Sequence, residues 1–489
     1  MRLTVIGQVV GWVSDACFTD FGHEVECVDL DDRRIDALEG GKMPKKASSF
    51  LHMGRGCNLG GRLGSRNAIR RIDMIAAEIP AANPMKTPRA EALPSTRVLL
   101  VLPTYFPESY GGGEQQTRRF ARALIERGVS VTILAPRLSH STPKRSAIDG
   151  VPIERLRLHA APNLGGRHML SFLSWCVQLV IWMLRRRDEF DVVHIIHARL
   201  HALPAALAGA LLRKPIIAKM GRGGRCCDLD VVREKKIVGR WASSVIKRHV
   251  SAFIANSRQI AGDLKRHGIE ADRIHMIPNG IDLPHKPRRQ PSTDDTRRFI
   301  CLGRLEPEKC LEHMIDAFAA LPAEAQAQLT VLGDGQCRAA LEEQTVRLGL
   351  SGRVKFAGAV EDVFPFLWKA DFYLSTSVSE GMSNALLEAM SCGVVPIITD
   401  VSGASDIVEH ERSGFLARSH VEYSRLLLRA LGLSEAERNA MAQHAVQTIA
   451  ARFSMESVAL LQMELYSTLM RQHVTSESNM LGTKRRFLW

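Results

Sequence analysis

From residue 97 to the end of the chain, short apolar segments alternate with longer amphipathic ones. This alternation predicts parallel β-sheets with helices on both faces, because neighbouring parallel strands are joined by a crossover that is usually a helix. The turn-rich segment 277–297, IPNGIDLPHKPRRQPSTDDTR, interrupts the series once. We therefore predict two doubly wound α/β domains joined by one proline-rich crossing. Ligands are expected in the cleft, at the carboxyl ends of both sets of strands.

Each predicted domain has five candidate strands. In the first domain they read RVLLVLP, SVTILAP, DVVHIIH, PIIAKM and AFIANS, and in the second RFICLG, QLTVLG, VKFAG, DFYLSTS and VVPIITD. A chain of 489 residues is also too long for one hydrophobic core.

The charge balance is basic, with 65 Lys and Arg against 52 Asp and Glu and a net charge of +13. This suits anionic ligands such as phosphates or anionic lipids. No nucleic acid is expected as a partner, because the sequence has no dense basic stripe with interleaved aromatic residues. The ten cysteines form no C-x-x-C pair and the N-terminus lacks a signal-peptide pattern, so we expect a cytoplasmic protein.

The stretch RFICLGRLEPEKCLEHMIDAF predicts a strand, a loop and a helix that begins at Pro307. Arg304 leaves the end of the strand, and Lys309 falls in the first turn of the predicted helix. Both cations would overhang the cleft beside a helix N-terminus, which itself attracts anions. We predict that they hold a pyrophosphate. The alternative is two surface cations that pair with Glu306 or Glu308.

The stretch SVSEGMSNALLEAMSCG, 377–393, contains the glutamates Glu380 and Glu388. Glu380 follows a predicted strand, and a helix capped by Ser383 is expected to run to the final glycine. Asn384 and Glu388 are four residues apart and share a helical face. Carboxylates suit vicinal diols, so we expect one to bind a sugar and the other a ribose, with the free backbone N–H groups facing phosphates. The donor-binding residues expected at this helix start are Gly381, Met382, Ser383 and Asn384.

The segments GRLEPEK, VLGDG, SEGMSNALLEAMSCG and IPNGID are similar to those of family 4 glycosyltransferases, retaining enzymes with the double-Rossmann GT-B fold. The resemblance covers roughly 97–475. It implies that Glu380 contacts the donor sugar and Glu388 the ribose, while Arg304 and Lys309 contact the diphosphate. It also implies that the leaving phosphate takes the acceptor's proton, and that neither a metal nor a cofactor is required.

The resemblance also sets the expected domain boundaries. The first GT-B domain, for the acceptor, is expected at 96–285, and the second, for the nucleotide-sugar donor, at 297–450. The terminal segment RFSMESVALLQMELYSTLM resembles the family's last helix, so a helix at 451–475 is expected to cross back to the first domain.

In the first domain, PTYFPESYGGGEQQTRRFARAL sets Gly111, Gly112 and Gly113 between a strand and a helix. Glycines let a backbone approach a ligand closely. We expect this loop to contact the donor phosphate or the acceptor, with a purely structural turn as the alternative.

One position departs from the family pattern. Many members carry a histidine after the fourth strand of this domain, near the reactive face of the sugar, but AKMGRGGRCCDLD offers Met220 and Gly221 instead. Lys219, Arg222 or Arg225 could serve the sugar or the acceptor in its place.

Two clusters could in principle bind a metal. His194, His197 and His201 fall across a strand end and a helix start, so they need not converge. Asp228 and Asp230 form an acid pair, but the GT-B resemblance implies that arginines, lysines and helix dipoles act where other transferases use metal. We therefore expect no metal site.

Residues 1–45 resemble the opening of nucleotide-sugar dehydrogenases of the UDP-glucose dehydrogenase type, with the strand RLTVIG, the turn GQVVG and the strand HEVECVDLDD. A glycine turn there holds a pyrophosphate, and an acid, here Asp29, binds the ribose. The turn lacks its middle glycine and no dehydrogenase catalytic half follows, so we interpret the block as a degenerate dinucleotide-binding fragment. Residues 46–95 read as a linker, and we expect a complete enzyme to begin near Met85.

The apolar stretch 168–184, HMLSFLSWCVQLVIWML, precedes Arg185, Arg186 and Arg187. It is shorter than the ~20 residues that span a bilayer and contains three polar interruptions. We interpret it as a buried helix, and the alternative is an interfacial helix with its arginines at lipid headgroups. With the basic net charge, it indicates peripheral contact with the inner membrane face.

These features predict a retaining, metal-independent hexosyltransferase. It would move a sugar from a nucleotide-diphosphate sugar to a hydroxyl of a lipid-linked or saccharide acceptor, in the synthesis of cell-surface polysaccharide or glycolipid. Arg304 and Lys309 would stabilise the charge that grows on the departing diphosphate. The alternatives are a nucleotide-sugar dehydrogenase, a GT-B sugar epimerase and a non-catalytic donor-binding protein.

Overall fold

The chain consists of two compact units, Met1–Met85 and Lys86–Trp489. The computed structural model describes residues 2–6, 24–28, 96–158, 167–224, 227–236, 238–284, 296–401 and 403–486. In the first unit, strands β1 (Arg2–Ile6) and β2 (Glu24–Val28) pair in parallel, as expected for the two N-terminal strands. The glycine turn, Asp29 and the linker lie outside the described residues, so the dinucleotide-binding interpretation stays a prediction.

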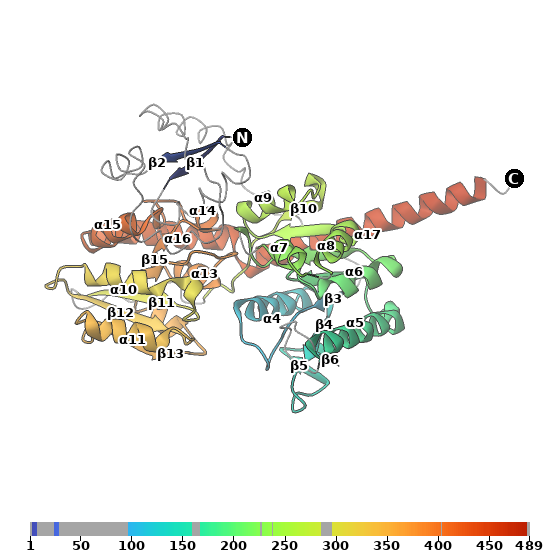
Figure 1. The fold of residues 1–489 in the computed structure, drawn as a ribbon, viewed down its shortest axis with the longest axis horizontal. Helices are drawn as coiled ribbons and strands as arrows, with labels where there is room; N and C mark the ends of the chain where they lie inside the picture. The colour runs from blue at the N-terminus through green and yellow to red at the C-terminus, as the bar shows by residue number, and fades with distance from the viewer. Residues whose placement is uncertain are drawn as a thin grey trace, which may run out of the picture. The chain divides into compact units, whose positions relative to one another are not determined.

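The second unit contains two separate sheets (Figure 1). The first has the strand order β10-β9-β8-β7-β3-β4-β6-β5, and only the β5–β6 pair is antiparallel. Its strands are β3 (Arg97–Val101), β4 (Ser130–Arg137), β5 (Arg145–Ile148), β6 (Val151–Arg157), β7 (Val192–Ile196), β8 (Ile216–Lys219), β9 (Ala252–Ala255) and β10 (Ile274–Met276).

The second sheet is parallel throughout, in the order β13-β12-β11-β14-β15-β16. Its strands are β11 (Arg297–Leu302), β12 (Ala327–Leu332), β13 (Val354–Gly358), β14 (Phe372–Ser375), β15 (Val395–Thr399) and β16 (Phe415–Ala417). All ten strands expected from the sequence are therefore present, and the prediction of two doubly wound sheets is confirmed.

Four strands of the second unit were not expected from the sequence. β5 and β6 form a hairpin whose turn residues, Asp149 and Gly150, have φ angles of +50° and +77°. An Asp-Gly step suits this turn, because both positions require a left-handed backbone. That dipeptide was an available signal for the hairpin, whereas β10 and β16 have only three residues each and give little pattern.

Helices cover both faces of the first sheet, since alternate residues of its strands point to opposite sides. Leu99 and Val101 of β3 pack in one core with α5 to α9, whereas Val98 and Leu100 pack in a second core with α4 and α17. The helices of this domain are α4 (Gly112–Ile125), α5 (Arg167–Arg185), α6 (Ala202–Leu211), α7 (Asp228–Arg233), α8 (Gly239–His249) and α9 (Arg258–Arg266), with 3₁₀ turns at Arg187–Glu189 and Ala271–Arg273.

The second sheet is layered in the same way. Phe299 and Cys301 of β11 face a core with α10, α11 and α15, and Ile300 and Leu302 face a core with α12, α13, α14 and part of α16. The helices are α10 (Leu311–Ala319), α11 (Arg338–Arg347), α12 (Phe364–Leu367), α13 (Asn384–Ser391), α14 (Ala404–Ile407), α15 (His420–Leu431) and α16 (Glu435–Arg452), with a 3₁₀ turn at Pro307–Lys309.

The final helix, α17 (Met455–Arg486), returns to the first domain and packs against α4. The two connections between the domains run alongside each other, because the Ile281 backbone exchanges hydrogen bonds with Phe453 and Met455 at 2.9 and 2.8 Å. Among the described residues, no helix is long and apolar enough to cross a membrane.

Candidate active site

Glu380 lies in the loop between β14 and α13, at the carboxyl end of the second sheet. Its carboxylate accepts a hydrogen bond from Ser377 Oγ at 3.0 Å and pairs with the Lys309 ammonium. Only 17% of the Glu380 side chain and 22% of the Lys309 side chain are exposed. A cation predicted to bind phosphate and an acid predicted to bind sugar are therefore in direct contact.

Lys309 does not lie in the first turn of a helix, as the sequence had suggested. It ends the 3₁₀ turn that begins at Pro307, and Cys310 then adopts a left-handed φ of +46° before α10 begins at Leu311. The Thr376 hydroxyl fixes this turn by donating to the carbonyls of Lys309 and Cys310, at 3.1 and 2.9 Å. The end of β14 thus holds the lysine in place.

Arg304 meets an acid from its own domain. Its Nη2 lies 3.5 Å from Glu308 Oε1, and 58% of its side chain is exposed. The same oxygen is 3.1 Å from Nη2 of Arg222, which follows β8 in the first domain. The pairing of Arg304 with Glu308 that the sequence left open is present, and it brings a second arginine to the same point. Exposed ion pairs of this kind are weak, so an incoming anion can compete for both arginines.

Glu388 on α13 pairs with Arg119 on α4, an arginine that the sequence analysis did not single out. Arg119 Nη2 is 2.7 Å from Glu388 Oε1, with 21% and 13% of the two side chains exposed. The available signal was the position of Arg119 in the helix that directly follows the three-glycine loop. The acid predicted to bind ribose is thus neutralised by the opposite domain.

Asn279 and Asn384 connect the start of α13 to the first domain. Asn384 Nδ2 donates to the carbonyl of Gly112 at 2.9 Å, and its Oδ1 accepts from Asn279 Nδ2 at 3.0 Å. Asn279 also donates to the carbonyl and the sulfur of Met382, which is buried. Ser383 caps α13 as predicted, accepting from the backbone N–H of Leu386 at 3.4 Å. The side chains of Asn384 and Met382 therefore join the domains.

Two glycine backbones pack against one imidazole, and a third glycine packs against one of these two. A Cβ on Gly221 would collide with the ring of His197, and a Cβ on Gly113 would be 2.5 Å from the Nε2 atom of that ring. A Cβ on Gly381 would in turn collide with the carbonyl of Gly221. The ring of His197 thus fills the space that a side chain at position 221 would occupy, where the sequence lacks the expected histidine.

His197 has an unusual environment. It follows β7 directly with a left-handed φ of +64°, and its Nδ1 atom is buried without a hydrogen-bond partner among the described residues. Burial lowers the pKa of the imidazole, although the negative charge of Asp228 opposes this shift. His197 is therefore neutral at physiological pH and sits beside Gly113 and Gly221.

The three histidines do not converge on a metal. His194 Nδ1 lies 2.7 Å from the Tyr466 hydroxyl of α17, and His201 Nε2 lies 3.0 Å from the carbonyl of Ile196. Asp228 is fully buried, where it accepts from Gly221 N at 2.6 Å and pairs with Arg199 at 3.1 Å. It therefore anchors the loop after β8.

Within the described part of the chain, the one group with metal-ligand spacing is Cys227, Asp230 and His267. Asp230 and His267 already pair at 3.1 Å, and burial raises the pKa of the Cys227 thiol to about 11.

Lys219 and Arg225 were two further candidates from the sequence. Lys219 ends β8, and burial lowers the pKa of its ammonium to about 8. Arg225 lies outside the described residues.

Gly111 caps the N-terminus of α4 with an extended backbone, and its carbonyl accepts the first helical hydrogen bond, from Gln115 N at 3.1 Å.

Solved structures with two such domains define the class. The chain is similar to Anabaena Alr3699/HepE in complex with UDP, with a TM-score of 0.61 and 20% identity over 76% of this chain and 100% of that one. It is also similar to sucrose-phosphate synthase from Thermosynechococcus elongatus, with a TM-score of 0.63 and 20% identity over 77% and 100% of the two chains. The protein therefore has the GT-B fold.

Sequence comparisons give the class of activity. Residues 111–280 match the family described as glycosyl transferase 4-like domain, and residues 296–432 match glycosyl transferases group 1. The protein is a glycosyltransferase of the GT-B type.

Curated relatives extend over both matched segments. The lipopolysaccharide core biosynthesis glycosyltransferase LpsE of Rhizobium meliloti is 27% identical over 370 residues, which cover 73% of this chain and 96% of the relative. The D-inositol 3-phosphate glycosyltransferase of Salinispora tropica is 26% identical over 362 residues, which cover 68% and 70%.

Proposed function

We propose that this glycosyltransferase moves a hexosyl group from a nucleotide-diphosphate sugar to an acceptor hydroxyl and retains the anomeric configuration. The observation that carries the proposal is the set of ion pairs at the carboxyl ends of the strands. Lys309 and Glu380 pair within the second domain, and Arg119 pairs with Glu388 between the domains. Such pairs hold charged groups ready for a ligand that carries both phosphates and diols.

In this proposal the diphosphate exchanges partners with the acids of the site. Arg304 and Lys309 would leave Glu308 and Glu380 to bind the phosphate oxygens, where negative charge grows as the bond to the sugar breaks. Glu380 is then free to accept hydrogen bonds from sugar hydroxyls. Glu388 would likewise exchange part of its contact with Arg119 for the ribose diol. Each acid has two acceptor oxygens, so the hydroxyls of the sugar and of the ribose keep both carboxylates hydrogen-bonded after the exchange.

The site offers cations in the place where other transferases use a divalent metal, which supports a metal-independent reaction. A retaining transfer by front-side displacement needs no separate general base, because the departing phosphate can take the proton of the acceptor. His197 is neutral and lies beside Gly113 and Gly221. We infer that it contacts the donor sugar in the position that the family fills from the following strand.

The names of similar proteins guide the choice of substrates. Solved HepE structures contain UDP, UDP with glucose, and UDP-glucose, so a UDP-sugar is the first donor to test. LpsE is named for lipopolysaccharide core biosynthesis, and a similar solved structure is titled lipopolysaccharide outer core galactosyltransferase WaaB. These names favour a saccharide or lipid-linked acceptor and a role in cell-surface polysaccharide or glycolipid synthesis.

Thermal-shift titration of the full chain with UDP-, GDP- and ADP-sugars tests the donor. The donor that raises Tm is then incubated with candidate acceptors in the presence and absence of a chelator, and the anomeric configuration of the product is read by NMR. A β-linked product from an α-linked donor would contradict retention, and loss of turnover with the chelator would contradict metal independence.

The alternatives have distinct outcomes in the same assays. Stabilisation by NAD with reduction of the nucleotide would support a dehydrogenase. Donor hydrolysis or epimerisation without a glycosylated product would support a donor-binding protein or an epimerase.

A further inference from the structure

Helix α5 has an apolar face that no described part of the chain covers. Its inner face, with Trp175, Leu179 and Met183, is buried in the first domain. The outer face would normally be polar. Here it includes five large apolar residues at helical spacing, exposed by 37% to 70%, and the exposed Ser174 among them. The five are Leu170, Leu173, Val177, Ile181 and Leu184. The expectation of a buried helix is thus right for one face only.

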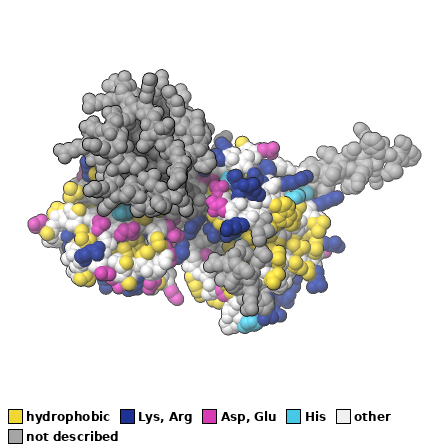
Figure 2. All heavy atoms as spheres, in the orientation of Figure 1, with side chains coloured by type: hydrophobic (Ala, Val, Ile, Leu, Met, Phe, Trp, Pro, Cys, Tyr) yellow, Lys and Arg dark blue, Asp and Glu magenta, His cyan; other side chains and the backbone are white. Residues whose placement is uncertain are grey.

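This apolar stripe continues onto the neighbouring helices. α6 packs against both α5 and α8. Leu207 and Leu211 on α6 are exposed by 38% and 69%, and Val238 and Trp241 at the start of α8 by 39% and 56%. Figure 2 shows hydrophobic side chains gathered over the α5 and α6 region of the first domain, with lysines and arginines around them. Half of the eighteen exposed large hydrophobic side chains described lie on these three helices or, for Val238, directly before α8.

Basic residues border the stripe at both ends. Arg185, Arg186 and Arg187 follow its last leucine. Arg186 pairs with Glu154 at 3.2 Å and with Glu189 at 3.0 Å, and Arg187 lies 3.7 Å from Asp188, so three acids offset part of the positive charge at this end. At the other end, a pocket of about 770 Å³ between α7 and α8 is lined by four basic and two acidic side chains, together with Gly239 and Trp241. The six charged residues are Arg233, Lys235, Lys236, Arg240, Asp230 and Glu234.

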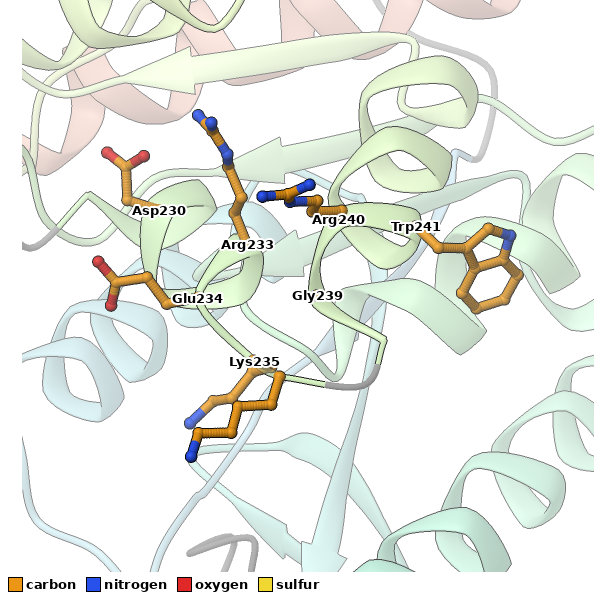
Figure 3. A pocket seen from close by; sticks show the side chains of 8 residues that line it. Asp230, Arg233, Glu234, Lys235, Gly239, Arg240 and Trp241 are labelled. Atoms are coloured by element: carbon orange, nitrogen blue, oxygen red, sulfur yellow. The ribbon is translucent and has the colours of Figure 1, made fainter.

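Figure 3 shows how the pocket side chains lie. The guanidinium groups of Arg233 on α7 and Arg240 on α8 lie between Asp230 and Trp241 in this view, while Asp230 and Glu234 lie at the end away from Trp241. The two guanidinium groups are therefore nearer the indole than the two acids are, in this view. An indole with one apolar end and one polar N–H is a side chain that favours the boundary between lipid and water.

We propose that the face formed by α5, α6 and the start of α8, here called the docking face, binds the surface of an anionic lipid bilayer. From Leu170 to Leu184 the stripe is about 21 Å long, at 1.5 Å per helical residue. It can enter the boundary between headgroups and acyl chains, while the arginines after α5 and the basic pocket take the anionic headgroups. Segment 170–184 has no charged side chain to prevent this insertion.

Charge complementarity favours a membrane over a second copy of the chain. A symmetric dimer through this face would bring the same basic rims close to each other, whereas an anionic bilayer offers opposite charge at every point. The docking face is independent of the proposed transfer reaction, but it would keep the enzyme beside a lipid-linked acceptor.

Co-sedimentation of the full chain with vesicles tests the proposal. Vesicles of phosphatidylcholine alone are compared with vesicles that contain about one-third phosphatidylglycerol, at low and high salt. We expect binding to the anionic vesicles, weakened by salt, and at least about tenfold weaker binding to the neutral ones.

Two sets of variants locate the binding. The triple variant Leu173→Glu, Val177→Glu and Ile181→Glu should lose binding at least about tenfold, since each added carboxylate opposes insertion and repels anionic lipid. The matched control, Val346→Glu, Val421→Glu and Leu428→Glu, changes three apolar residues of the second domain that are exposed by 52% to 67%, and it should keep most of the binding. In the basic pocket, Lys236→Gln with Arg240→Gln should weaken binding to anionic vesicles severalfold.

Each other outcome overturns the proposal. Absence of binding to anionic vesicles excludes the membrane as the partner, and equal loss in both triple variants shows that only net charge matters. If light scattering finds a dimer that the α5 triple variant dissociates, the occupant is a second copy. Donor-induced thermal shift is measured on the same samples, so failure of this surface is distinguishable from failure of the transferase proposal.

Discussion

The two domains of the second unit share one architecture but contribute different groups to the cleft. The second domain contributes carboxylates and Lys309, and holds several of them with its own side chains: Ser377 holds Glu380, and Thr376 fixes the turn before α10. The first domain contributes close-packed glycine backbones, one neutral imidazole and the arginines Arg119 and Arg222.

This difference shows how the charges of the site depend on domain contact. Glu380 is neutralised by Lys309 from its own domain, whereas Glu388 is neutralised by Arg119 from the other. Glu308 pairs with one arginine from each domain, Arg222 from the first and Arg304 from the second. A ligand that takes over these arginines therefore acts on both domains, while the Lys309–Glu380 pair can stay formed whatever the distance between the domains.

The largest expected effect follows from removing a group of the second domain that would meet the developing charge. Lys309→Ala and Glu388→Ala should each lower transfer by about 10²–10³-fold or more, because the diphosphate or the ribose loses its partner. Circular dichroism should show an intact fold. The control is Glu343→Ala, which removes an exposed carboxylate from α11 and should leave transfer unchanged. Wild-type turnover in either site variant would defeat the assignment.

The next effect concerns the imidazole of the first domain. His197→Ala should lower kcat by about 10²-fold if the ring positions the sugar, since small misplacements at a reacting centre cost that much. Adding Gly221→His to this variant places an imidazole into the vacated space from the neighbouring strand, and should restore part of kcat. If the double variant is no better than His197→Ala while its Tm recovers, the ring only fills space.

The local features of this molecule could be predicted from sequence, because their signals lie within a few residues. The helix α13, its Ser383 cap and its end at Gly393, with a φ of +74°, follow from one seventeen-residue stretch. The ten expected strands follow from short apolar runs in the same way. The turn at Lys309 was misjudged because Pro307 permits a 3₁₀ turn as readily as an α-helix, and Thr376 from a distant strand decides between them.

The pairing across the cleft could not be predicted from spacing. Arg119 and Glu388 are 269 residues apart, and nothing near either residue specifies the other. The position of His197 beside residue 221 could have been inferred more easily. β7 and β8 are neighbours, with Ile196 opposite Lys219, so the residues that follow them must lie together at the same sheet edge. A glycine at 221 leaves room there, and the next strand end supplies a ring.

A third prediction contrasts the two domains in acid. Burial lowers the pKa of His194 and of His201, both in the first domain, to about 3. A histidine with a lowered folded pKa stabilises the fold above its unfolded pKa of about 6.5, and this contribution is lost as pH falls toward 3. By pH 5 each should cost about 2 kcal/mol.

The first domain should therefore unfold first on acidification. The measurement is the drop in Tm between pH 7 and pH 5. His194→Gln should make this drop smaller by a few degrees, although it should lower Tm at both pH values. His140→Gln removes an exposed histidine and should keep the wild-type drop. An unchanged drop in His194→Gln would mean that this ring is not the group that takes up protons.

The smallest effect measures the coupling between the domains. Arg119→Ala leaves the little-exposed Glu388 without its cation, and Glu388→Ala leaves Arg119 without its anion, so each should lower the free energy of unfolding. If the pair joins the domains directly, the double variant should be less destabilised than the sum of the two single variants by about 1 kcal/mol.

The same cycle on Arg118 and Asp149, which pair at 2.6 Å within the first domain, gives a reference for a pair that does not cross the cleft. Saturating donor should reduce the coupling of the first pair and leave the second unchanged, because only Glu388 is proposed to exchange part of its contact with arginine for a ribose. If the coupling of Arg119 with Glu388 persists in full with donor bound, the pair is a permanent link between the domains. The assignment of Glu388 to the ribose would then be wrong.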